Sequence, residues 1–134
     1  MNGQMNVFRT ILISLFVFFV LAVLAVEIIY ISERPRSEFA NYIDAKASGL
    51  MDRGWIPTFI PRSSAEIKEQ HDLDANWVKM SFSYDTADKA VTRAACNTER
   101  PIRGGVEFGC KYFGNNVSIK LYDDGSAELY SSPY

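Results

Sequence analysis

The stretch TILISLFVFFVLAVLAV, residues 10–26, contains no charged residue and decides how the rest of the chain is interpreted. As a helix it reaches about 25 Å, slightly less than the about 30 Å of a bilayer's hydrocarbon core. The span can be completed on either side, because apolar residues continue beyond Glu27 to Ile31 and the long side chain of Arg9 can reach water. We therefore predict an N-terminal transmembrane anchor over residues 1–31.

Two residues mark the edge of this predicted span. A carboxylate inside hydrocarbon is costly and is a functional candidate, whereas Glu27 at the depth of the lipid headgroups would cost little. Tyr30 is placed like an interfacial aromatic anchor. We expect both residues at the membrane edge, with Glu27 inside the hydrocarbon core as the alternative.

A cleaved signal peptide is the alternative to an anchor. Residues 23–25 can serve as a small-residue cleavage site, but the apolar run is longer than the usual core of a signal peptide. No cysteine follows the run closely, so a lipoprotein cleavage signal is missing there. We expect an uncleaved, single-pass signal anchor.

Two cysteines, Cys96 and Cys110, suggest where the remaining chain lies. An even pair behind an export-type N-terminus predicts one disulfide, closing a loop of about 15 residues. Two free buried thiols in a cytosolic domain are the alternative, and no neighbouring His or Cys completes a metal site. Arg9 on one side and Arg34 with Arg36 on the other leave the orientation undecided. The disulfide favours a cytoplasmic N-terminus and a periplasmic domain, held in the inner membrane.

Composition excludes one class of partner and sets the size of the domain. The net charge is −2, and no stripe of Lys and Arg interleaved with aromatics suggests nucleic acid. About a hundred residues follow the anchor, enough for one small domain. We place a linker at 32–37 and an extracytoplasmic domain at 38–134.

The first element predicted after the linker is an amphipathic helix of about four turns beginning at Glu38. Ser37 can cap it, and Gly54 with Pro57 can end it. The apolar stripe at helical spacing consists of Phe39, Tyr42, Ile43, Ala47, Leu50 and Met51.

The next stretch, WIPTFIP at residues 55–61, is extended, because proline disfavours helix at the residue before it. Its apolar side chains either fold onto the core as a lid or form a preordered contact surface for a partner. We predict a candidate partner contact formed by Trp55, Ile56, Phe59 and Ile60, with His71 and Asp74 beside them.

The segment after it predicts a short helix and then a polar turn. Ser63 and Glu66 fit a capping box for a helix to about residue 70, with Ile67 inward. His71, followed by Asp72 and Asp74, suggests a metal or acid/base site, but matches no known spacing. We expect these carboxylates to bond turn amides.

Alternating apolar residues predict an antiparallel sheet in the C-terminal half. Residues 87–96 are ambiguous between helix and loop, and 97–105 look like a loop. The expected fold is therefore α+β, with the amphipathic helix packed on about four strands. The alternating sets are Val78, Met80, Phe82 and Tyr84; Val106, Phe108, Cys110 and Tyr112; Val117, Ile119 and Leu121; and the last strand at 126–130.

One segment resembles small, uncharacterised bacterial envelope proteins. It carries Gly54-Trp55-Ile56-Pro57, Ile60-Pro61, Ser64-Ala65, Ile67, Glu69, His71-Asp72-Leu73-Asp74 and Asn76. Those proteins also begin with a hydrophobic anchor or a lipoprotein signal, so the resemblance implies an envelope location and no particular chemistry.

A second resemblance, to type IV pilin-like proteins, concerns architecture alone. Pilin-like chains have a Gly-Phe processing junction and a glutamate near the start of the apolar stretch. Here Gly3 precedes Gln4, and Glu27 lies at the far end.

The resulting functional hypothesis is a membrane-anchored envelope protein that binds another envelope or membrane protein without catalysis. We expect no catalytic residue, metal or cofactor. One alternative is an accessory subunit held in a larger membrane complex through its helix, and another is an enzyme centred on His71. The partner, the oligomeric state and the biological process are not encoded in any recognisable motif.

Overall fold

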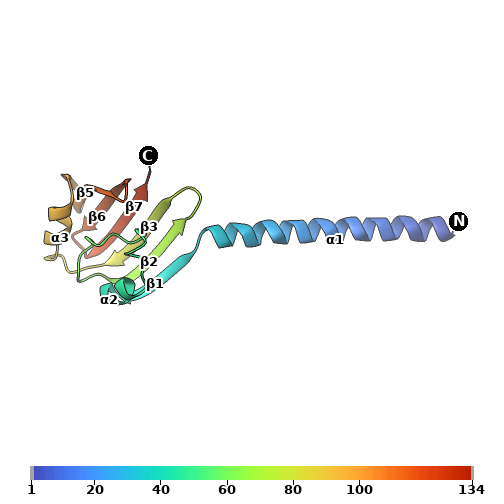
Figure 1. The fold of residues 1–134 in the computed structure, drawn as a ribbon, viewed down its shortest axis with the longest axis horizontal. Helices are drawn as coiled ribbons and strands as arrows, with labels where there is room; N and C mark the ends of the chain where they lie inside the picture. Colours follow the sequence, from blue (N-terminus) through green and yellow to red (C-terminus); the bar gives the residue numbers. More distant parts are fainter. Residues whose placement is uncertain (1, 134) are drawn as a thin grey trace. The chain divides into compact units, whose positions relative to one another are not determined.

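The computed structural model describes residues 2–133, with side chains from residue 7 onward. The chain forms two compact units, Met1–Glu33 and Arg34–Tyr134. The first is the single helix α1 (Asn2–Glu33), drawn in blue in Figure 1. Its part Val7–Glu33 is long and apolar enough to cross a membrane. Glu27 and Tyr30 both lie within this helix.

The second unit is built on one seven-stranded antiparallel sheet rather than the four strands predicted. Its strand order is β1-β2-β3-β7-β6-β5-β4. Two six-residue helices, α2 (Tyr42–Ala47) and α3 (Ala90–Ala95), contact it near opposite edges (Figure 1). The strands are β1 (Arg36–Asn41), β2 (Ala65–Asp72), β3 (Trp77–Ser83), β4 (Thr98–Ile102), β5 (Gly105–Tyr112), β6 (Asn115–Tyr122) and β7 (Ser126–Ser132).

The predicted alternation in the C-terminal half is confirmed. Strands β5, β6 and β7 form a meander, and β3 pairs with β7 as the fourth strand. The inward residues of all four strands join one core, which Ile56 and Ile60 of the preceding loop also enter. The interior is thus a one-sided core between the sheet and the segments that cover it.

The predicted long helix from Glu38 is wrong. Its first residues form β1, in which Phe39 pairs with Ile67 of β2. The helix begins only after Asn41, whose side chain accepts a hydrogen bond of 3.0 Å from the Asp44 amide. Ile43, expected to face inward, is 75% exposed. Pairing with β2 satisfies the backbone groups of this segment, so tertiary structure overrides a modest helical pattern.

The predicted helix at 63–70 is also wrong, because this segment forms most of β2. Ser63 does not cap a helix; its hydroxyl accepts a hydrogen bond of 3.0 Å from the Asp85 amide. Glu66 has a φ of 51° at a shift in the pairing register between β2 and β3. This bulge lets Ile67 face the core, as predicted, although the local pattern resembles a helix start.

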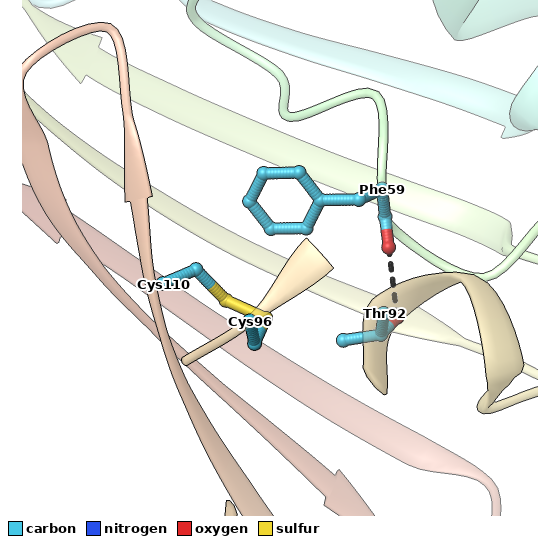
Figure 2. The surroundings of a disulfide bond; sticks show 4 residues. All are labelled: Phe59, Thr92, Cys96 and Cys110. Atoms are coloured by element: carbon cyan, nitrogen blue, oxygen red, sulfur yellow. Dashed lines mark hydrogen bonds between the residues drawn. A yellow bond between two sulfur atoms is a disulfide. The ribbon is translucent and has the colours of Figure 1, made fainter. Parts of the chain in front are cut away.

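The structure shows which conformation two further segments adopt. The ambiguous stretch before Cys96 forms α3. The predicted loop after it contains the edge strand β4, in which Pro101 is tolerated because an edge strand leaves one row of donors unpaired. Cys96 and Cys110 form the predicted disulfide, which joins the end of α3 to β5 (Figure 2).

Candidate functional site

The sole histidine lies on the core face of β2. The Nδ1 atom of His71 is 2.6 Å from Oε1 of Glu69, two residues earlier on the same face. The Trp55 indole stacks on the imidazole with ring centroids 4.1 Å apart and an interplanar angle of 17°. The structure therefore places the histidine next to the 55–61 segment, as expected. The imidazole is buried beneath Trp55 of that segment.

Burial controls the electrostatics of this pair. It raises the pKa of Glu69 to about 8, against a smaller opposing effect of Arg53. Burial, with the charge of Arg53, lowers the pKa of His71 below its usual value. Both groups are thus held neutral near pH 7, and a protonated Glu69 can donate to Nδ1. The other oxygen, Oε2, has no hydrogen-bond partner, which costs less for a neutral carboxyl than for a carboxylate.

This arrangement gives the hypothesis of a metal or acid/base centre at His71 little support. The side chains of His71 and Glu69 are 6% and 0% exposed, respectively. Within residues 2–133, no group of three or more His, Cys, Asp and Glu side chains is placed to hold a metal ion. A reactant would have to displace Trp55 to reach the imidazole.

Asp72 and Asp74 take different roles in the turn after β2. As predicted, Asp72 bonds turn amides: its Oδ1 accepts from the backbone of Asp74 at 3.1 Å and of Ala75 at 2.8 Å. Its Oδ2 accepts from Nε of Arg34 at 2.7 Å. The Ala75 amide and the Arg34 guanidinium hold the pKa of Asp72 below its usual value. The Asp74 side chain is exposed.

The 55–61 segment forms the lid on the core, one of the two alternatives left open by the sequence. Ile56 and Ile60 have no exposed surface, and Phe59 is buried. Its backbone carbonyl accepts a hydrogen bond of 2.7 Å from the Thr92 hydroxyl of α3 (Figure 2). Of the four candidate contact residues in this segment, only Trp55 is half-buried and the other three are buried, so the segment does not form the alternative, an exposed apolar surface.

The opposite face of the sheet is a second candidate site, which no motif in the sequence predicts. We call it the open face. Along β3, Lys79 and Ser81 are exposed while Val78 and Met80 are buried. A groove of about 730 Å³ lies on this face and extends across the sheet from β1 to β5. The lining includes Arg36, Lys68, Gln70, Ser118, Lys120 and Tyr130.

The alternation that predicts a half-buried strand at 77–84 also places Lys79 and Ser81 on its outer face, and both are exposed. The local sequence does not indicate which side chains of other strands lie beside Lys79 and Ser81. Strands distant in sequence supply the neighbours: Lys79 lies opposite Gln70 of β2 and Tyr130 of β7. The site is therefore a product of strand order.

Comparison with known proteins gives one partial match. A search of curated proteins and a search of solved structures each found nothing that matches. A family model described as the YbbD head domain matches residues 33–83. This region runs from the last residue of α1 to the end of β3 and contains α2, the lid segment and the Glu69–His71 pair. Over these residues the chain is similar to the YbbD head domain.

Proposed function

We propose that this protein is a membrane-anchored envelope protein whose globular unit binds another protein without catalysis. The observation that carries the proposal is the open face, an uncovered and hollowed side of the sheet. Helices α2 and α3 and the lid all lie on the core side of the sheet, so among the described residues no element covers the open face. A shaped surface on rigid strands can match the shape of a protein partner.

The proposed location is the inner membrane, with a cytoplasmic N-terminus and a periplasmic domain. The apolar helix α1 supports an anchor, and the Cys96–Cys110 disulfide supports an oxidising compartment. A reporter enzyme that is active only outside the cytosol, fused after residue 134, should be active. Activity of a cytosol-specific reporter at the same position would contradict this orientation.

A non-catalytic role is part of the proposal. Glu69, whose pKa is raised to about 8, and His71 are both buried, and Trp55 stacks on His71. Such a pair can contribute to the structure of the core without contacting a substrate. The groove of the open face is lined instead by residues of mixed charge on rigid strands.

Site-specific photocrosslinking tests the binding role. A photoreactive amino acid replaces Ser81 in the groove or, as the control, the exposed Ala94 on α3. Both variants are expressed as the full chain in the native host. We expect one discrete protein adduct from position 81 and none from position 94. Equal adducts at both positions, or no adduct at position 81, would overturn the proposal.

A further inference from the structure

The open face carries two neighbouring rows of side chains with different charge patterns. Successive strands place one residue each in a row, because paired residues lie side by side across the sheet. The paired row consists of Glu38, Lys68, Ser81, Glu128, Lys120, Glu107 and Arg100. The basic row consists of Arg36, Gln70, Lys79, Tyr130 and Ser118.

Charges within the paired row compensate one another. Positive and negative residues alternate along it, and opposite charges on adjacent strands attract. At its β4 end, the Arg100 guanidinium forms an ion pair with Glu107. The same carboxylate accepts a hydrogen bond of 2.6 Å from Ser118. This row can therefore remain solvated without a ligand.

The basic row contains cations and no carboxylate. Arg36 and Lys79 are exposed, and neither takes part in an ion pair among the described residues. Lys79 lies over the Trp77 ring, with Nζ 5.3 Å from its centroid. The next residue of the row, Tyr130, is 45% exposed. The row thus offers two positive charges that form no ion pair among the described residues, followed by an apolar ring, on a chain whose net charge is −2.

We propose that the basic row is the docking site for an acidic amphipathic helix of a partner protein, a refinement that rests on the proposed binding function. Carboxylates of the helix pair with Arg36 and Lys79, since guanidinium and carboxylate are geometrically matched. An apolar side chain of the same helix covers Tyr130. The helix then covers part of a sheet face that is otherwise left to solvent.

Strand spacing specifies the pattern on such a helix. Arg36 and Lys79 lie on β1 and β3, two strand spacings apart, or about 9.6 Å. Carboxylates seven residues apart on one helix face are separated by about 10.5 Å. Tyr130, one strand further, lies about 14.4 Å from Arg36, which corresponds to about ten residues of helix. The expected partner therefore has acidic residues at positions i and i+7 and an apolar residue at i+10.

Fluorescence anisotropy with synthetic peptides tests this assignment. The probe is a labelled helical peptide with Glu at positions i and i+7 and Leu at i+10, and the comparison peptide carries Gln in place of both Glu. The protein is the full chain in a neutral detergent at low salt. We expect the Glu peptide to bind at least tenfold more tightly than the Gln peptide.

Two double variants with the same change in net charge locate the binding site. Arg36→Glu/Lys79→Glu should weaken binding of the Glu peptide at least tenfold. Lys46→Glu/Arg103→Glu, two exposed cations outside the row, should change it less than twofold. A peptide with Lys at positions i and i+7 should bind the first double variant more tightly than it binds the natural chain, a gain that an unfolded variant cannot produce.

Several results would overturn the inference. These are no binding of the Glu peptide to the natural chain, equal weakening by both double variants, or preferential binding of phosphatidylglycerol vesicles or an anionic polysaccharide over the peptide. If position 81 crosslinks a protein whose binding Arg36→Glu/Lys79→Glu leaves unchanged, the proposed binding function stands and only the charge-based assignment fails.

Discussion

Glu69 and His71 form a buried pair on the core face of β2, with Oε1 and Nδ1 2.6 Å apart. Trp55 covers the imidazole, and Oε2 of Glu69 has no hydrogen-bond partner. The histidine that the sequence presents as the natural catalytic candidate is therefore part of the interior. Its burial predicts a measurable effect on stability.

The first prediction concerns the pH dependence of stability. The pKa of Glu69 is about 8 in the folded chain, against an ordinary value of 4.5. Between these values the folded state keeps a proton that the unfolded state loses, so the free energy of unfolding falls as pH rises. Glu69→Gln cannot titrate and should reduce this fall, as measured by chemical denaturation of the full chain in neutral detergent at pH 5 and pH 8.

Glu66→Gln, on the same strand but exposed, tests for a general effect of losing one carboxylate. The lowered pKa of His71 acts in the opposite direction, because stability due to a neutral histidine is present above its unfolded pKa and is lost as pH falls. The contribution of His71 to the pH dependence of stability remains in the Glu69→Gln variant. An unchanged difference between pH 5 and pH 8 in Glu69→Gln would contradict the burial of a neutral carboxyl.

The second prediction concerns the lid. Ile60 is fully buried, so Ile60→Ala removes packed methyl groups and leaves a cavity. We expect a loss of about 2–5 kcal/mol in the free energy of unfolding. The matched control Ile43→Ala, at a position 75% exposed, should change it by about 0.5 kcal/mol or less. Similar values for both variants would mean that the lid is not packed on the core.

The third prediction concerns the hydrogen bond between α3 and the lid. Thr92 is fully buried, and its hydroxyl donates to the Phe59 carbonyl at 2.7 Å (Figure 2). Thr92→Val keeps the shape but leaves the carbonyl unpaired, at a cost of about 1–3 kcal/mol in the free energy of unfolding. Thr92→Ser retains the hydroxyl and should cost less. If Ser is as destabilising as Val, the methyl packing matters more than the bond.

The fourth prediction concerns the disulfide. Replacing both Cys96 and Cys110 by Ser opens a loop of about 15 residues and should lower the free energy of unfolding by about 3 kcal/mol. Adding a reductant to the natural chain should have a similar effect and should not alter the double variant further. Free thiols in protein taken from its native host would argue against the proposed oxidising location.

Much of the sheet followed from the sequence because its strands have strict alternation. Residues 77–84, 106–112 and 117–121 each place apolar side chains on one face at period two, a pattern that a helix does not accommodate. The failures lie at both edges of the sheet. At one edge, the predicted loop at 97–105 contains β4. At the other edge, Phe39 of β1 pairs with Ile67 of β2, and neither strand has a clean local pattern.

The sequence by itself determined an apolar helix, a cysteine pair suited to a disulfide, and a meander with one buried side, because these depend on local composition and period. Only the tertiary structure decided the remainder: that His71 is enclosed beneath Trp55, that the proline-rich segment is core, and that Arg36 and Lys79 share one exposed row. Those outcomes depend on strand order and register, which bring together residues far apart in the chain and which no local pattern specifies.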